Sequence, residues 1–197
     1  MRSGRPLWCI LLVLVWATAS LPAGAQPSAL QSVADPKGRF TIDFPADWRI
    51  LTPPTGMVAV MGIAPPQGNP HRASVNVIVE DLPRDMPAQA YAEISEQMLK
   101  TIFQDYTVVQ QGPMAIAGQA AYYRYYTWRT NKGEVFYQVQ VYVTAGRRGF
   151  VITGSTLNEP EFTRKDIPII VQIIGTFRPI IGTSRPITKT LRTDQGS

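Results

Sequence analysis

Cysteine is almost absent from this sequence of 197 residues: Cys9 is the only one, and it lies in the first apolar run. Its early position and its neighbours differ from those of the lipidated cysteine of bacterial lipoproteins. A chain that loses this run has no thiol. Disulfides, thiolate metal sites and cysteine nucleophiles are then excluded, and the hydrophobic core alone must stabilise the fold.

The first apolar run has the layout of a secretory signal peptide. Two arginines precede the uncharged stretch Leu7–Leu21, and the small residues Ala23 and Ala25 stand before a cleavage point at Gln26. We therefore predict a signal peptide over residues 1–25 and an exported protein, periplasmic or extracellular. A retained membrane anchor is the alternative, although the run is shorter than the roughly 20 apolar residues of a spanning helix.

Strong charge is also lacking. The formal net charge is +5, and loss of the two leading arginines leaves +3, which is only mildly basic. Proteins that bind nucleic acid usually carry a clustered basic face, so we expect no nucleic-acid partner. Residues 180–197 are rich in Pro, Gly, Ser and Thr and weakly basic. We predict a flexible tail there, able to make weak contact with an anionic membrane surface.

Residue sets that carry chemistry are scarce. His71 is the only histidine, and Ser155 lacks the G-x-S-x-G frame of a nucleophile elbow. Glu80, Asp81 and Asp85 lack the spacing of a calcium-binding loop. We therefore predict no catalytic residue, no metal site, no cofactor and no enzyme activity. An envelope hydrolase with paired carboxylates is an alternative, because such pairs meet in space and leave no spacing in the sequence.

Alternating apolar residues predict a largely β domain over residues 39–179, preceded by a linker over residues 26–38. Phe40, Ile42 and Phe44 alternate with polar residues and indicate a half-buried strand that ends at Pro45. Further strands are predicted over Met57–Ala64, Ser74–Val79, Thr107–Ala117 and Phe150–Ser155, with a long hairpin over Ala121–Val143. Glycine and proline at positions 112 and 113 indicate that the strand containing them is bulged or at a sheet edge.

Two helices are predicted from their apolar periodicity. The first carries a stripe at Tyr91, Ile94, Met98 and Ile102, with Asp85 as a candidate cap. The second runs to about residue 174, and its apolar stripe consists of Ile167, Ile170, Val171, Ile174 and Phe177.

The start and middle of the second helix also carry signals. Asn158 and Glu161 have capping-box spacing. Pro168 predicts a break in the helix, with a new start capped by Asp166.

The hairpin raises the question of a binding surface. Its strands are expected to place one set of side chains on a common face: Tyr122, Arg124, Tyr126, Trp128, Gln138 and Gln140. Because neither face of the hairpin is uniformly polar, we expect both faces to be at least partly covered, with the aromatic rings packed structurally. The alternative is that this set forms a shallow partner-binding surface, since aromatic and arginine residues are enriched in binding hot spots.

The segment "FTIDFPADWRI" at Phe40–Ile50 resembles the opening of PsbP-like domains, which include the photosystem II extrinsic protein and the DcrB-like exported proteins of bacteria. The order of elements, ending in "IIGTFRP" at Ile173–Pro179, is also similar. The resemblance implies an α+β fold, a largely antiparallel sheet flanked by helices in an α/β/α sandwich. Characterised members are largely accessory proteins, and no ligand motif transfers residue by residue.

We therefore interpret the sequence as a non-catalytic exported accessory or binding protein of the cell envelope, with an unknown envelope protein or ligand as its partner. Besides the hydrolase, a small-ligand carrier is an alternative. A carrier would need an enclosed apolar cavity between sheet and helix.

Overall fold

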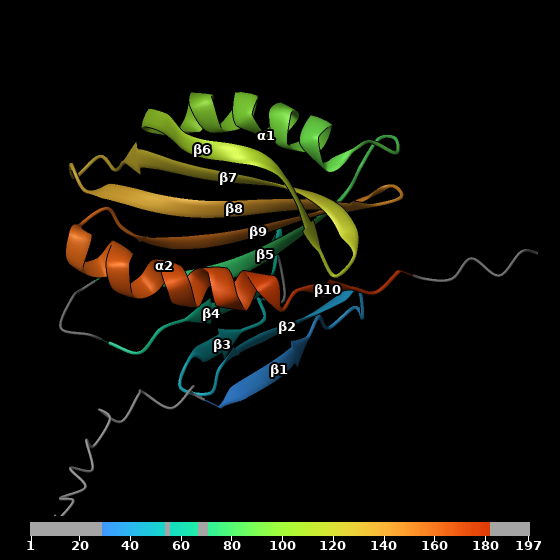
Figure 1. Cartoon of the computed structure of the whole chain (residues 1–197), viewed down its shortest axis with the longest axis horizontal. Helices are drawn as coiled ribbons and strands as arrows, with labels where there is room; N and C mark the ends of the chain where they lie inside the picture. Colours follow the sequence, from blue (N-terminus) through green and yellow to red (C-terminus); the bar gives the residue numbers. More distant parts are fainter. Residues whose placement is uncertain (1–28, 54–55, 67–70, 182–197) are drawn as a thin grey trace, which may run out of the picture.

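The computed structural model describes residues 29–53, 56–66 and 71–181. The predicted signal peptide and the predicted tail from residue 182 lie outside these residues (Figure 1). The strands are β1 (Leu30–Ala34), β2 (Phe40–Pro45), β3 (Arg49–Leu51), β4 (Val58–Ile63), β5 (Ser74–Asp81), β6 (Gln104–Ile116), β7 (Gln119–Arg129), β8 (Val135–Ala145), β9 (Arg148–Leu157) and β10 (Arg178–Pro179), and the helices are α1 (Ala88–Ile102) and α2 (Pro160–Gly175).

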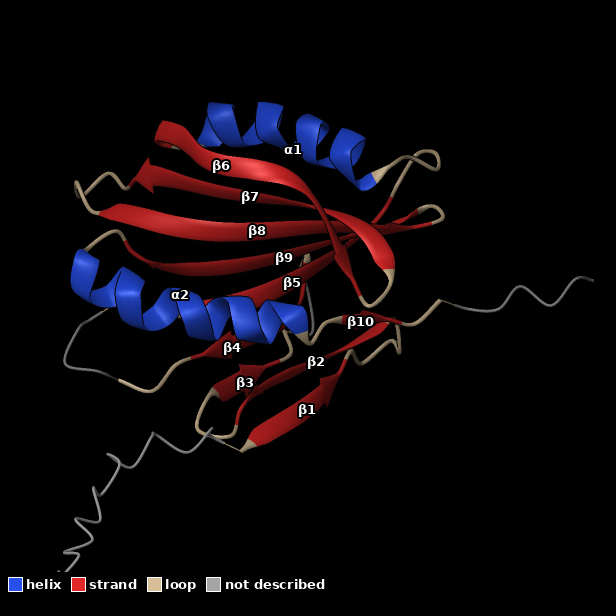
Figure 2. Cartoon of the chain, viewed as in Figure 1, coloured by secondary structure: helices blue, strands red, loops and turns tan. Residues whose placement is uncertain are grey.

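A seven-stranded sheet forms the body of the domain (Figure 2). Its order is β3-β4-β5-β9-β8-β7-β6, and every neighbouring pair is antiparallel. Helix α1 packs on β6, β7 and β8, while α2 packs mainly on β9 and β8. The two helices cover opposite faces of the sheet. The predicted α+β sandwich is therefore confirmed, as is the prediction that both faces of the hairpin are covered.

The larger core lies between the sheet, α2 and β2. The rings of Phe40, Phe150 and Phe177 contact one another there and are fully buried. A smaller cluster lies under α1, where Tyr91 meets Tyr142 edge to face. The Phe40 strand predicted from the sequence is β2, and it supplies the centre of the larger core.

A small sheet of order β1-β2-β10 joins both ends of the domain. β1 pairs with β2 from Leu30 opposite Pro45 to Ala34 opposite Thr41. The prediction of a linker over residues 26–38 is therefore wrong from residue 30 onward. The sequence pattern of β1 gives little indication of a strand, because β1 has no buried residue and only its Val33 packs against the core.

Helix α1 buries a different face from the one predicted. Tyr91 is buried, but Ile94, Met98 and Ile102 are 58–62% exposed. The residues that the helix buries are Ala88, Tyr91 and Ala92. The sheet beneath is already filled with large rings, so small side chains let the helix approach closely.

The predicted caps do not form. Pro87 is the N-cap of α1 and Glu159 is the N-cap of α2, and neither helix start has a side-chain capping bond. The predicted cap of α1 at Asp85 and the predicted capping box of α2 at Asn158 and Glu161 are therefore wrong.

Helix α2 runs without a break through Pro168. Proline removes the hydrogen bond to the carbonyl of Arg164. Both residues are exposed, so water can reach that carbonyl. Asp166 does not begin a new helix but is buried, where it accepts a hydrogen bond from the hydroxyl of Thr156.

Strand β6 is one of the two edge strands of the large sheet, as the glycine and proline at positions 112 and 113 indicated. It is bulged at two places and joins β7 through Ala117 and Gly118, both at positive φ. Such a two-residue turn suits the twist of a hairpin.

No helix within the described part of the chain has the length and apolar character needed to cross a bilayer.

Candidate functional site

The predicted binding face lies between the sheet and α1. Tyr122 is opposite Tyr142, Arg124 is opposite Gln140, and Tyr126 is opposite Gln138, so the predicted residues do share one face. Their exposed fractions correct the prediction of a surface, because the following are buried: Tyr122 (8%), Arg124 (0%), Tyr126 (1%) and Gln140 (7%). These residues are not accessible to a partner in this conformation.

Arg124 is the centre of a buried polar network. Its Nη2 donates to Oε2 of Glu96 at 2.9 Å, and its Nη1 donates to the carbonyl of Ala92 at 3.0 Å, both on α1. Its Nε donates to Oε1 of Gln111 on β6 at 2.9 Å. The guanidinium thus ties α1 to the sheet, and its hydrogen-bonding capacity is largely used by the fold.

Two of the buried tyrosines around Arg124 donate hydrogen bonds to amides. The hydroxyl of Tyr142 donates to Gln140, and that of Tyr126 donates to Gln138. Burial raises the pKa of Tyr126 and Tyr142 far above the ordinary value, and it raises the pKa of Tyr106 to about 12. These phenols are therefore neutral at physiological pH and unsuited to proton transfer.

Trp128 and Gln138, the remaining predicted residues, are half-buried. The Trp128 ring is stacked between Phe103 and Phe136, with centroid distances of 4.3 and 5.3 Å. Gln138 also donates to the hydroxyl of Ser155 at 3.3 Å. Their part in binding stays a prediction.

His71 lies at the turn end of the hairpin, where it contacts the carboxylate of Glu134 and meets the Phe136 ring edge-on. Glu80 accepts a hydrogen bond from the Tyr91 hydroxyl at 2.6 Å. Over the described ranges, no three His, Cys, Asp or Glu side chains are grouped so that they could hold a metal ion.

A half-open apolar groove runs between α2 and the far face of β6, β7 and β8. We call it the tyrosine groove. Its volume is about 320 Å³. It is lined by Gln110, Met114, Tyr123, Tyr125, Val139, Val141, Val171, Ile174 and Gly175. It is open to solvent, unlike the enclosed cavity that the carrier alternative required.

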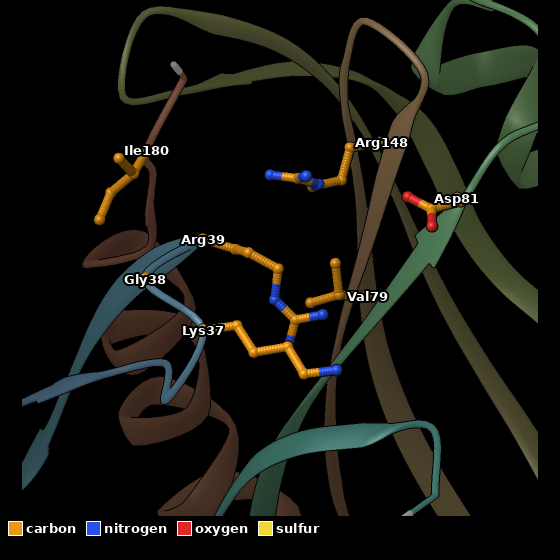
Figure 3. A pocket seen from close by; sticks show the side chains of 7 residues that line it. All are labelled: Lys37, Gly38, Arg39, Val79, Asp81, Arg148 and Ile180. Carbon is orange, nitrogen blue, oxygen red and sulfur yellow. The ribbon is translucent and has the colours of Figure 1, made fainter.

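A second recess, which we call the basic pocket, lies where the β1–β2 turn meets the large sheet (Figure 3). Its volume is about 420 Å³. It is lined by Lys37, Gly38, Arg39, Val79, Asp81, Arg148 and Ile180. Figure 3 shows the charged ends of Lys37, Arg39 and Arg148 directed towards the same space.

Arg39 is held in place by Asp35, which is 3% exposed. Its Nε and Nη2 donate to the two carboxylate oxygens at 2.6 and 2.8 Å, and its backbone N–H donates to Oδ2 at 3.1 Å. These hydrogen bonds lower the pKa of Asp35 below its ordinary value. The arginine is therefore rigid while one side of it faces the pocket.

Sequence reasoning missed this pocket. Lys37 fell in the predicted linker, Arg39 fell at the first position of the predicted domain, and Arg148 fell between the predicted hairpin and the predicted strand Phe150–Ser155. The only local signal is basic residues in two turns, and only the pairing of β5 with β9 and of β2 with β10 brings those turns together.

Solved structures of low sequence identity share this fold. One is protein PA94 of unknown function from Pseudomonas aeruginosa, a putative regulator, with 17% identity and a TM-score of 0.55 over 77% of this chain and 97% of that chain. Another is the cyanobacterial PsbP (CyanoP) of Synechocystis, with 13% identity and a TM-score of 0.58 over 82% and 99%. A third is LpqN, involved in cell envelope biogenesis of Mycobacterium tuberculosis, with 13% identity and a TM-score of 0.57 over 77% and 90%.

These similarities establish a PsbP-like fold, and none of the three descriptions names an enzyme activity. No curated protein matches the sequence. The model of the DcrB family matches residues 41–176, which is more than half of the chain and includes both helices, the whole large sheet and nearly all of β2. The chain therefore belongs to the DcrB family.

Proposed function

We propose that this protein is an exported accessory protein of the cell envelope, which acts by binding a partner or ligand and not by catalysis. The observation that carries the proposal is how its charged groups are used. The buried arginine under α1 is neutralised by Glu96, and the buried Asp35 is neutralised by Arg39. Asp166 accepts a hydrogen bond from Thr156.

The open recesses are also unlike a hydrolase site. A hydrolase of the paired-carboxylate type would need two free carboxylates converging on one pocket. The tyrosine groove has none in its lining, and the basic pocket has Asp81 alone. An arrangement of this kind is better suited to recognition than to acid–base chemistry.

Export is supported by the signal-peptide layout of residues 1–25 and by membership of the DcrB family. The similar fold of LpqN, involved in envelope biogenesis, favours the same compartment. The proposal places the domain outside the cytoplasm, where a thiol-free chain needs no protection from oxidation.

The test begins with the full chain, tagged at its C-terminus and expressed in a Gram-negative host. We expect a product that starts at Gln26 by mass and is released by osmotic shock. A full-length product in the cytoplasm would overturn the export part of the proposal.

Binding is tested by placing a photoreactive phenylalanine analogue at Lys37 or at Tyr125, with Glu93 on the outer side of α1 as the control position. We expect a recurring envelope component to be crosslinked from a recess position and not from the control. Turnover of generic ester, glycoside or phosphoester substrates that is lost in Asp81→Asn would instead favour an enzyme.

A second candidate function is favoured by the tyrosine groove. At about 320 Å³ it falls at the lower end of the range for small-molecule sites, and aromatic and aliphatic side chains line it. It suits a small apolar ligand. Val171→Trp should fill the groove and abolish co-purification of such a ligand, detected by native mass spectrometry. Val109→Trp, at an exposed position outside the groove, is the matched control.

A further inference from the structure

We propose that the basic pocket is a binding site for a phosphate group, carried either by a soluble phosphate ester or by a phospholipid headgroup. This site goes beyond the role proposed above, and it would bind phosphate whether or not the protein acts in the envelope. The argument rests on which charges in the pocket are free, on their balance and on their arrangement.

Two of the three cations in the pocket are not used by the fold. Among the described residues, neither Arg148 nor Lys37 has an ion pair or a side-chain hydrogen bond, whereas Arg39 is bound to Asp35. Arg148 is only partly exposed, so the sheet restricts its side chain. A partly desolvated guanidinium without an anion gains most from a charged ligand.

The charge balance of the pocket is positive. Asp35 is neutralised by Arg39, which leaves Asp81 against Lys37 and Arg148. Asp81 stands opposite Arg148 in the β5–β9 register, yet no ion pair joins the two side chains. An anion in the pocket would therefore meet two free cations and one fixed guanidinium.

The arrangement favours a phosphate over a carboxylate. A planar carboxylate is satisfied by one guanidinium fork, as Asp35 is by Arg39. The pocket instead presents two cations from the β1–β2 connection and one from the start of β9, in a space of about 420 Å³ (Figure 3). A tetrahedral anion can direct its oxygens to several cations at once.

The rim of the pocket fits the remainder of a phosphate ester. Val79 and Ile180 form aliphatic walls beside the cations, and Ile180 and the neighbouring Ile181 are 47% and 52% exposed. The carbon part of an ester would lie against these side chains. In the phospholipid case, the same isoleucines would lie at the headgroup level of a bilayer.

The variant that tests the site is Lys37→Gln with Arg148→Gln, because neither side chain bonds to the fold. Arg39 is left intact, since its loss would leave the buried Asp35 without its partner. The matched control is Lys132→Gln with Lys165→Gln, which removes the same charge from exposed positions outside the pocket.

The naturally processed protein is titrated with inorganic phosphate, glycerol phosphate and acetate at constant ionic strength, followed by amide NMR. We expect saturable shifts around Gly38 and Arg148 with the phosphates. We expect the double variant to bind them about tenfold or more weakly, because charge-assisted hydrogen bonds are lost. The control should stay within about twofold, since distant surface charges act weakly through salt.

A second arm uses co-sedimentation with phosphatidylglycerol vesicles and with phosphatidylcholine vesicles. The site is assigned to a headgroup if the protein binds phosphatidylglycerol vesicles, the double variant loses this binding and the control variant retains it. Binding of soluble phosphates alone assigns it to a free ester. Absence of binding in both arms, equal binding of acetate, or equal loss in the control variant would overturn the proposal.

Discussion

The guanidinium of Arg124 and the carboxylate of Glu96 form the principal ionic link between the large sheet and α1, with Nη2 2.9 Å from Oε2. The arginine side chain is 0% exposed and the glutamate side chain is 15% exposed. Glu96 has a second partner in Lys100 at 2.8 Å, whereas Arg124 has no second anion among the ion pairs of the described residues.

Removal of Glu96 should lower the free energy of unfolding by more than removal of Arg124. Glu96→Leu leaves a buried guanidinium without a counter-charge, so the free energy of unfolding should fall by about 3–5 kcal/mol. Arg124→Met leaves a carboxylate that still touches water and Lys100, so the loss should be smaller, about 1–3 kcal/mol. Chemical denaturation of both variants and of the double variant measures this order. A larger loss of stability in Arg124→Met than in Glu96→Leu would contradict this prediction.

The ion pair between Asp35 and Arg39 should make the stability of the fold depend on pH in the acid range. Hydrogen bonds from Arg39 lower the pKa of Asp35 in the folded state, against a value of about 4 in the unfolded chain. Between these values the unfolded chain binds a proton that the folded chain does not, so stability rises with pH in this window. The contribution is complete at neutral pH and is lost as the pH falls through the folded pKa.

Asp35→Asn should remove that acid dependence. We expect the variant to be less stable than the wild type at pH 7 by about 1–3 kcal/mol and the difference to shrink as the pH falls below about 4. Denaturation curves across the acid range measure it. A constant difference at all pH values would show that the carboxylate charge is not responsible.

The outer stripe of α1 should tolerate polar residues. Ile94→Gln and Met98→Gln change side chains that are 58% and 62% exposed, so each should alter stability by no more than about 0.5 kcal/mol. Ala92→Leu, at a fully buried position against the sheet, should cost about 1–3 kcal/mol through overpacking. Thermal unfolding of the three variants distinguishes the observed face from the predicted one, which would give the opposite order.

Gly154 packs so closely against α2 that a larger residue at this position should destabilise the fold. A Cβ at Gly154 would overlap Cγ2 of Ile170. Gly154→Ala should therefore cost about 1–3 kcal/mol by overpacking. Ile170→Ala removes that methyl group, so the double variant should lose less stability than the two single variants added together. Additive losses in a double-mutant cycle would argue against a direct clash.

Much of the sheet could be predicted from the sequence, because the alternation of side chains is local. The faces of β7 and β8 were assigned correctly, since Tyr122 and Arg124 do lie on one side with Gln140. The large core was also partly predictable, because Phe40, Ile170, Ile174 and Phe177 are buried as their spacing indicated. The predicted stripe was wrong at Val171, which is 42% exposed, and it left out Ile173, which is buried.

The errors have a different origin. The sequence could not indicate which face of α1 would be buried, because Ala92 beside large rings packs better than Ile94. It could not indicate that a helix would cover Arg124, because this depends on where α1 returns to the sheet. Nor could it join Lys37 to Arg148, which meet only through strand pairings distant in the sequence. These features depend on tertiary contacts that leave no local pattern.

The central strand β2 of the small sheet is flanked by β1 from the beginning of the domain and by β10 from its end. Ile180 extends this closure, since its backbone N–H donates to the carbonyl of Arg39 at 2.8 Å. During synthesis, which begins at the N-terminus, this layer therefore cannot be completed until residues 178–180 arrive. Until then the Phe40 strand lacks one neighbour, so completion of the native state waits for contacts that are distant in the sequence.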